Sequence, residues 1–215
     1  MSLVFVDIET TGLNPRRDAV TQLAAIAVDY EMSVAEEFEV KVWFNWKAVP
    51  KDTLQISRFD AATWQRDAVR PKAAARMFGA FLRRHASVTV QGRRGRYAVA
   101  RLAAHNAAFD GEFLSRWYRR LGVFLPAHPR TLCTLQRALW LFEEHVELGA
   151  PPDFKLLTLC EHFGVELAEC DAHDALADVR ATVELYAALG QAVTGPVPAP
   201  TVATGGWRTL RSVLE

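Results

Sequence analysis

The sequence has no excess of charge of either sign, few cysteines and no long apolar run, and each absence excludes a class of protein. Its 25 Lys and Arg residues are matched by 25 Asp and Glu residues, so the formal net charge is zero. This balance argues against a protein that wraps duplex nucleic acid through a strongly basic face. It does not exclude an enzyme that grips a strand end through bound cations. No stretch approaches the roughly 20 apolar residues that span a bilayer, and the short apolar run before Asp7 lacks the basic start of a signal peptide.

The three cysteines and the length of 215 residues narrow the possibilities further. Cys133, Cys160 and Cys170 are an odd number without a compact framework, which favours a reducing compartment and a soluble, cytoplasmic protein without membrane contact. The spacing of the cysteines and nearby histidines fits no tetrahedral zinc site. The length suits one α/β domain, which we place at residues 1–190. The Pro/Gly-rich composition of residues 191–215 indicates a linker or tail.

Hydrophobic patterning predicts strands first and helices later. Apolar, β-rich runs occupy residues 3–9, 19–29 and 35–44. Their short connections indicate an antiparallel meander. Helices are expected to start at Ser57 and Pro71. Helices are predicted at residues 71–85, 107–121, 131–142, 155–163 and 174–189. This order, with a strand–helix unit near residue 100, points to a mixed sheet flanked by helices.

A Gly-bounded turn separates two further β-like runs, at residues 88–91 and 97–104. We expect a hairpin with basic side chains near its tip, at Arg93, Arg94 and Arg96. If these cations lie near a catalytic cleft, they would contact the phosphates of a nucleic-acid substrate. The alternative is a solvated turn that merely keeps the chain soluble.

Asp7 and Glu9 lie two residues apart in the first apolar strand, so their side chains point to the same face. Burying two like charges side by side is costly, because the carboxylates repel each other and lose hydration. A divalent cation offsets both costs, and Mg²⁺ or Mn²⁺ prefers carboxylate oxygen. The alternative is that both residues lie beyond the end of the strand, exposed to water.

The turn after this strand offers contacts to a nucleotide. Thr10, Thr11 and Gly12 are small, so backbone N–H groups can approach a phosphate or a terminal nucleotide. Leu13 could pack on a base. By itself, however, Thr-Thr-Gly-Leu is a common turn.

The segment at residues 104–114 joins an apolar strand to a predicted helix. Phe109 offers a ring face for base stacking, which contributes about 1–3 kcal/mol per base where such contacts have been tested. Asp110 adds a third carboxylate. Taken alone, the segment is more simply explained as a helix with Asn106 as N-cap, Phe109 in the core and Asp110 in its first turn.

The last informative segment is residues 173–182. Five residues of helix rotate about 500°, so His173 and Asp178 do not share a helical face. They converge only if His173 lies on the loop before the helix and Asp178 points inward from it, which makes Asp174 the N-cap. A histidine placed there can transfer protons near neutrality, whereas a lone histidine before a helix is usually a surface residue.

In order and local context, five residues match the DEDDh 3′→5′ exonuclease family residue by residue: Asp7, Glu9, Asp110, His173 and Asp178. The spelling Asp-Ile-Glu-Thr-Thr-Gly-Leu resembles the group that contains the epsilon proofreading subunit of the bacterial replicative polymerase. The resemblance covers residues 3–189. It implies a ribonuclease H-like α/β fold, with a five-stranded mixed sheet and helices on both faces.

The resemblance also implies roles for these residues. Asp7, Glu9 and Asp178 would ligate one metal and Asp7 a second, with Asp110 acting directly or through water and His173 as the general base. The terminal nucleotide would be held by backbone or side-chain groups of Thr10, Thr11, Leu13, Asn106 and Phe109. Two divalent cations, Mg²⁺ or Mn²⁺, would stabilise the attacking and leaving oxygens of an in-line displacement that releases a nucleoside 5′-monophosphate.

The implied substrate is a single-stranded 3′ end, and the spelling of the first segment favours DNA. The alternative is an RNA-directed 3′→5′ exoribonuclease of the RNase T or oligoribonuclease type, which shares the same core residues. A second alternative is a non-catalytic module that binds nucleic-acid ends, which would be favoured if any of the five positions were lost. Residues 190–215 are too short and Pro/Gly-rich to resemble a polymerase-binding region, so tight association with a polymerase is not expected.

Overall fold

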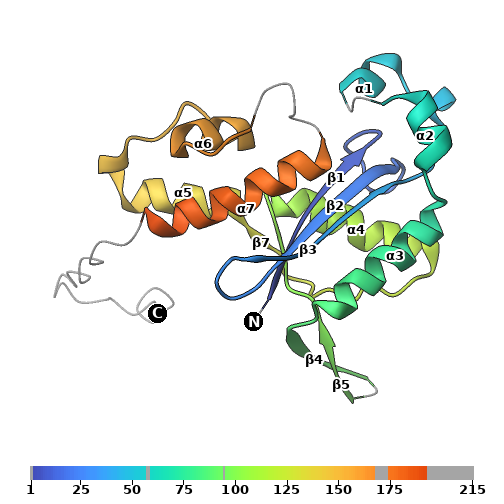
Figure 1. Ribbon diagram of the computed structural model, residues 1–215, viewed down its shortest axis with the longest axis horizontal. Coiled ribbons are helices and arrows are strands. Elements are labelled where there is room, and N and C mark those ends of the chain that lie inside the picture. The colour runs from blue at the N-terminus through green and yellow to red at the C-terminus, as the bar shows by residue number, and fades with distance from the viewer. Residues whose placement is uncertain (1, 57–58, 94, 168–173, 193–215) are drawn as a thin grey trace, which may run out of the picture.

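The computed structural model describes residues 2–56, 59–93, 95–167 and 174–192. Its centre is a mixed sheet of five strands in the order β3–β2–β1–β6–β7 (Figure 1). The strands β1 (Leu3–Thr10), β2 (Val20–Val28) and β3 (Val34–Lys41) form the antiparallel meander that the sequence predicts. The strands β6 (Leu102–Ala104) and β7 (Leu132–Cys133) continue the sheet in parallel on the other side of β1. The expected five-stranded mixed sheet is confirmed.

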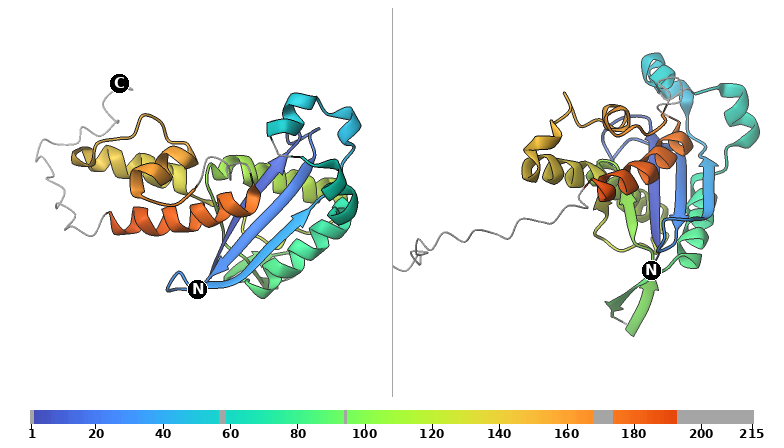
Figure 2. Two further views of the ribbon diagram at one scale, coloured as in Figure 1. Left: turned by 45° about the horizontal axis from the view of Figure 1, so that its top comes forward. Right: turned by 60° about the vertical axis from the view of Figure 1, so that its left-hand side comes forward.

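Helices cover both faces of this sheet, as the views in Figures 1 and 2 show. On one face, α7 (Ala175–Gln191) packs on β1 and β2, and α5 (Thr134–Glu144) and α6 (Leu156–Phe163) pack on α7. On the other face lie α3 (Pro71–Arg84) and α4 (Ala107–Leu121). The shorter helices are α1 (Lys51–Ile56), α2 (Ala61–Asp67) and the 3₁₀ helices η1 (Trp46–Ala48) and η2 (Val146–Leu148). None of the helices in the described ranges is long and apolar enough to cross a membrane.

Strand β1 divides its side chains between the two helical layers, because successive residues of a strand point to opposite faces. The alternate residues from Val4 to Ile8 pack in the core cluster that contains α3 and α4. Phe5 packs in the cluster that contains α7. Asp7 and Glu9 follow the same alternation as Phe5, so they face the layer of α7.

The region around residue 100 differs from the prediction. The apolar run at residues 97–104 is not one strand: β5 (Gly95–Val99) pairs only with β4 (Val88–Gly92), in a separate two-stranded hairpin. After the hairpin the backbone changes partners: Ala100 N donates to Pro126 O, and Arg101 O accepts from Val4 N of β1. Only after these bonds does β6 enter the main sheet.

Two helix predictions are also corrected. A helix was expected over residues 131–142, but the first part of this range forms the strand β7 and helix α5 begins at Thr134. Strand β7 was not predicted because two residues are too few to show a strand period. Ser57 lies outside the described residues, and the helix after it begins at Ala61, where the side chain of the N-cap Asp60 accepts from Thr63 N. Helix α1, which precedes it, was not expected. The predicted division at residue 190 stays a prediction.

Candidate active site

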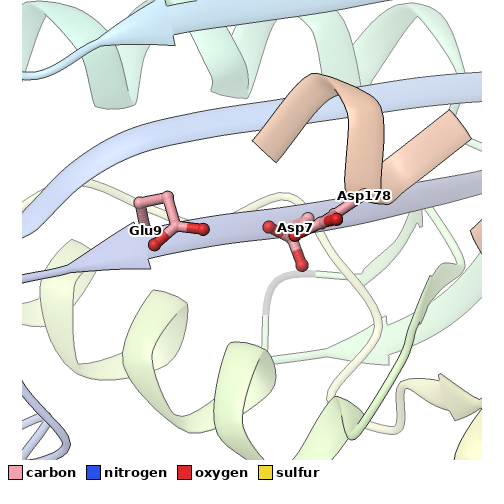
Figure 3. A group of neighbouring side chains, drawn as sticks. All are labelled: Asp7, Glu9 and Asp178. Carbon is pink, nitrogen blue, oxygen red and sulfur yellow. The ribbon is translucent and has the colours of Figure 1, made fainter. Parts of the chain in front are cut away.

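An acidic cluster lies at the carboxyl end of β1. Strand β1 supplies Asp7 and Glu9, and the first turn of α7 supplies Asp178. One carboxylate oxygen of each residue lies within 4.8 Å of the oxygens of the other two. Figure 3 shows Asp178 reaching from α7 to Asp7, with Glu9 beside them on the strand. The two-residue spacing in β1 and the inward face of α7 therefore bring three carboxylates together.

Asp110 approaches this cluster from the opposite helical layer. It lies in the first turn of α4, which follows β6, the parallel neighbour of β1. Its side chain is only 3% exposed. In the described part of the chain, Asp110 is not one of the three residues whose oxygens lie within 4.8 Å of one another. Its charge is nevertheless the strongest of those that act on Asp7. Asp110 is thus placed beside the cluster, as a fourth carboxylate.

Burial and mutual repulsion raise the pKa values of these groups. Burial raises the pKa of Asp7 well above its usual range, and the charges of Asp110, Glu9, Asp178 and Asp174 raise it further. Burial, followed by the charge of Asp178, raises the pKa of Glu9 to about 8. Burial raises the pKa of Asp110 to about 8, although backbone hydrogen bonds oppose the shift. Burial and repulsion thus disfavour the ionised form of these carboxylates, and a divalent cation can replace the protons that they would otherwise hold.

A cavity of about 480 Å³ opens onto the acidic cluster. Besides the four carboxylates, it is lined by Ile8, Thr10, Gly12, Leu13, Thr53, His105, Asn106 and Phe109. Leu13 is 85% exposed and Phe109 is half-buried, so both apolar side chains are accessible to a nucleotide base. The structure therefore brings together most of the residues that the sequence singles out.

Local hydrogen bonds hold the loop after β1 against the cavity. Thr10 Oγ1 donates to Gly12 O at 2.7 Å, and Thr11 Oγ1 accepts from Ala19 N at 2.9 Å. A Cβ atom at Gly12 would lie 2.4 Å from Asp18 Oδ2, so only glycine fits there without a shift of Asp18. Thr11 does not line the cavity, and its side chain serves to close the loop. The contact that the sequence predicts for Thr11, through its backbone N–H, stays a prediction.

Asn106 occupies the N-cap position of α4, but it does not cap the helix with its side chain. Its backbone is left-handed, with φ 57° and ψ 48°, and it makes no side-chain capping bond within the described structure. Asparagine is one of the few non-glycine residues that adopt this conformation readily. The predicted N-cap position of Asn106 is confirmed, but its side chain makes no capping bond among the described residues. Its exposed side chain instead borders the cavity.

His105 and Thr53 line the cavity although the sequence did not single them out. His105 Nε2 donates to Phe154 O at 3.1 Å, so His105 Nδ1 is the acceptor for Thr134 Oγ1, at 2.9 Å. Burial lowers the pKa of His105. This histidine is therefore neutral and engaged at both nitrogens. The sequence offered one indication for His105, namely a polar residue at the end of an apolar strand. Nothing in the sequence indicated Thr53, because α1 meets the cavity only in the tertiary structure.

His173 lies outside the described residues. The next residue, Asp174, is the N-cap of α7, and its Oδ1 accepts from Leu176 N at 3.1 Å and from Ala177 N at 3.2 Å. The predicted N-cap is confirmed. Asp178 points inward one turn later, as the sequence analysis requires for convergence with His173.

The hairpin arginines do not border this cavity. The base of the β4–β5 hairpin lies at the amino end of β1, where Ser87 Oγ donates to Ser2 O at 2.7 Å. Figure 1 shows the hairpin projecting from that end, away from the carboxyl end of β1. Arg93 and Arg96 therefore do not lie at the catalytic cleft, which was one of the two alternatives left open by the sequence. Arg94 lies outside the described residues.

Comparisons with known proteins agree with this geometry. Residues 4–186 match the family model described as Exonuclease. The chain is 28% identical over 194 residues to Ribonuclease T of Haemophilus ducreyi, across 86% of this chain and 83% of that protein. The fold is similar to that of E. coli exonuclease I in its zinc-bound complex with single-stranded DNA, with a TM-score of 0.69, 21% identity, and coverage of 88% of this chain and 40% of that chain. A complex of the same enzyme with a dT13 oligonucleotide gives a TM-score of 0.68 at 22% identity, covering 88% and 41%. This chain thus spans less than half the length of exonuclease I.

Proposed function

This chain belongs to the exonuclease family, whose model covers residues 4–186, and we propose that it hydrolyses single-stranded nucleic acid from the 3′ end to nucleoside 5′-monophosphates. The observation that carries the proposal is the convergence of Asp7, Glu9 and Asp178, with oxygens within 4.8 Å of one another, on a cavity that also contains Phe109. Carboxylates and an accessible aromatic ring are the groups that a cation-assisted nuclease needs at one place.

The acidic cluster fits divalent cations. Asp7, Glu9 and Asp178 would hold a metal through one oxygen each, and Asp110 would contribute directly or through water. Bound divalent ions supply Lewis-acid stabilisation of phosphoryl oxygens and lower the pKa of a bound water. We propose Mg²⁺ or Mn²⁺, two in number, because these hard cations favour oxygen ligands and four carboxylates supply them.

The general base is proposed to be His173. In the sequence it directly precedes Asp174, the N-cap of α7, which is the helix that carries Asp178. His105 also lines the cavity, but its two nitrogens are occupied by Phe154 O and Thr134 Oγ1. His105 therefore cannot take a proton from water without losing a hydrogen bond in a half-buried position.

The terminal nucleotide is proposed to lie between the loop after β1 and the start of α4. Leu13 and Phe109 would contact its base, and Asn106 would donate or accept a hydrogen bond at the rim of the cavity. Backbone N–H groups near Thr10 and Thr11 would approach its phosphate. In this arrangement the phosphodiester next to the terminal nucleotide lies over the carboxylates.

DNA is the proposed principal substrate, because the sequence of the segment from Asp7 to Leu13 resembles that of the proofreading-subunit group. The similarity to Ribonuclease T, over 83% of that protein, favours an exoribonuclease as the second candidate. The two substrates differ by a 2′-hydroxyl, which the cavity must either accept or exclude.

A direct test uses 5′-labelled single-stranded DNA and RNA of equal sequence, incubated with the full chain and Mg²⁺ or Mn²⁺. We expect a ladder that shortens by single nucleotides, and no ladder in EDTA. The ratio of the two rates identifies the preferred sugar, and the same assay with Zn²⁺ tests the metal. Endonucleolytic fragments, or a ladder of equal intensity in EDTA, would reject the proposal.

A further inference from the structure

An exposed aromatic pair, with one ring from the β4–β5 hairpin and one from the loop after α4, lies beside two arginines. The rings of Tyr97 and Phe124 meet edge to face, with centroids 5.8 Å apart and an interplanar angle of 69°. They are 41% and 56% exposed, which is unusual for large apolar side chains that already contact each other. Arg93 and Arg96 line the same groove, whose volume is about 440 Å³. We call this the hairpin groove.

Two glycines shape the hairpin groove. A Cβ atom at Gly92 would lie 2.6 Å from Tyr97 Cε1, so the missing side chain lets the tyrosine ring lie against the neighbouring strand. Gly95, paired with Gly92 in the hairpin register, has φ +121°, a conformation that L side chains rarely adopt. Phe124 comes from the loop after α4 and forms the other wall. The tyrosine ring is therefore held in place although it faces solvent.

The charges of the hairpin groove are not compensated. Arg93 and Arg96 are exposed, and neither takes part in any of the ion pairs found among the described residues. Exposed ring faces next to free guanidinium groups are the combination that binds single strands, because bases stack on the rings while the arginines contact phosphates. Duplex binding would need a larger basic face than a chain of zero net charge provides.

We propose that the hairpin groove is a second binding site for single-stranded nucleic acid, which holds the part of the substrate 5′ of the end in the active site. The proposal rests on the proposed nuclease function. Arg101 O accepts from Val4 N at the base of the hairpin. Roughly 25 Å of extended backbone lies between the two sites, at about 3.3 Å per residue. This length counts three residue steps from Asp7 to Val4 and five from Arg101 to Arg96. A stacked strand rises about 3.4 Å per nucleotide, so about eight nucleotides connect the sites. A tetranucleotide would reach only the active site, and a 16-mer would reach both.

The test compares oligo(dT) of 4 and 16 nucleotides. Binding is measured by fluorescence anisotropy in an Asp7→Asn background, which prevents hydrolysis during the measurement. Tyr97→Ala is expected to raise Kd for the 16-mer about fivefold or more, as the loss of a stacked base predicts, and to leave Kd for the 4-mer unchanged. Tyr97→Phe, which keeps the ring, should bind like the parent. Tyr30→Ala is the matched control, because Tyr30 is an 85% exposed tyrosine of the β2–β3 turn and is not one of the residues that line the hairpin groove.

The arginines are tested by salt dependence. The double variant Arg93→Ala/Arg96→Ala should make the slope of log Kd against log salt shallower by about 1.4 for the 16-mer, since each phosphate contact on a single strand contributes about 0.7. The exposed Arg76 of α3 provides the matched control, Arg76→Ala. In the catalytically intact chain, the same variants should raise KM for the 16-mer and leave kcat on the 4-mer unchanged.

The outcomes separate this proposal from the nuclease proposal. An unchanged Kd and salt slope for the 16-mer in all hairpin variants overturns the second site, while hydrolysis of the 4-mer would still support the nuclease. A chain that hydrolyses nothing, yet loses 16-mer binding in the hairpin variants, supports the groove and rejects the nuclease. Sedimentation of the parent and of Tyr97→Ala is the last arm. A dimer that the variant dissociates would make the hairpin groove an interface between copies and overturn the proposal.

Discussion

Gln22 Nε2 donates a hydrogen bond of 3.3 Å to Asp174 Oδ2, across 152 residues of sequence. The same nitrogen donates to Glu39 Oε1 at 3.0 Å, and the Gln22 residue is only 2% exposed. Gln22 lies opposite Glu9 in the pairing of β1 with β2. A single buried amide thus connects the strand next to Glu9 with the N-cap of the helix that carries Asp178. This hydrogen bond adds a polar contact to the direct packing of α7 on β1 and β2, which brings Asp178 to the acidic cluster.

Substitution of Gln22 should lower kcat, although the Gln22 side chain is not proposed to contact the substrate. Gln22→Met removes the hydrogen bonds and is expected to cost about 1–3 kcal/mol of unfolding free energy, because two acceptors lose a buried partner. Gln22→Glu places a carboxylate against those of Asp174 and Glu39, so we expect a larger loss of stability and a lower kcat. Urea unfolding and single-turnover hydrolysis measure both effects. Gln65→Glu, on the exposed surface of α2, is the control. Equal kcat in all three variants would exclude a positioning role for Gln22.

Asp178→Asn should abolish hydrolysis and leave the protein folded. The amide removes one metal ligand, and the loss of several kcal/mol of charge stabilisation corresponds to a rate lower by about 10³-fold or more. Glu184→Gln is the matched control, since Glu184 is an exposed carboxylate on the same helix. Turnover within tenfold of the parent in Asp178→Asn, measured on labelled single strands, would remove Asp178 from the site.

The stability of the metal-free protein should fall as pH rises from 5 to 8. The raised pKa values of Asp7, Glu9 and Asp110 mean that the folded state holds protons which the unfolded chain has already released. The contribution of Glu9 and Asp110 to the unfolding free energy is therefore highest below about pH 4, decreases as pH rises and levels off above about pH 8, and the raised pKa of Asp7 acts in the same direction. Asp7→Asn removes one of the three carboxyl groups that lower the unfolding free energy at high pH. We expect it to stabilise the EDTA-treated protein at pH 8 by on the order of 1–3 kcal/mol, and by less at pH 5.

Chemical unfolding of the parent and of Asp7→Asn at several pH values checks this expectation. The control is Glu184→Gln, which should follow the pH profile of the parent. An unfolding free energy that rises between pH 5 and pH 8 in the parent would show that these carboxyl groups are ionised and stabilised in the metal-free fold.

Divalent cations should stabilise the protein more at pH 8 than at pH 5.5. Metal and protons compete for the same carboxylates, so a lower proton occupancy strengthens metal binding. A free metal concentration of 100 times Kd adds about 2.7 kcal/mol, and thermal unfolding with a series of Mn²⁺ or Mg²⁺ concentrations measures it. Asp7→Asn should lose most of this stabilisation. A melting temperature that does not respond to either metal at pH 8 would contradict the proposed metal site.

His173→Ala should lower the turnover rate by about 10²–10⁴-fold, the range typical of general-base catalysis, with little change in metal-induced stabilisation. The comparison variant is His105→Gln, which breaks the contacts to Thr134 and Phe154. It should lower the melting temperature while retaining a pH–rate profile like that of the parent. If the His173→Ala variant retains the rate and its dependence on pH between 6 and 8, another group is the base.

Short-range patterns in the sequence determined much of this protein. The two-residue period of β1 places Asp7 and Glu9 on one face, and the helical period sets α4 at its predicted bounds. The capping preference of aspartate marks the start of α7 at Asp174. These features depend on residues a few positions apart, so a local pattern is sufficient to predict them.

Only the tertiary structure decided which distant segments meet. The sequence left open whether the hairpin arginines lie beside the catalytic cleft, and the bond between Arg101 O and Val4 N places the hairpin at the opposite end of β1. Nothing in the sequence indicated that Thr53 lines the cavity, and the strand β7 was too short to show a period. Which segments pair, and at which end, depends on hydrogen bonds and packing between residues far apart in the chain. A local pattern contains no record of those contacts.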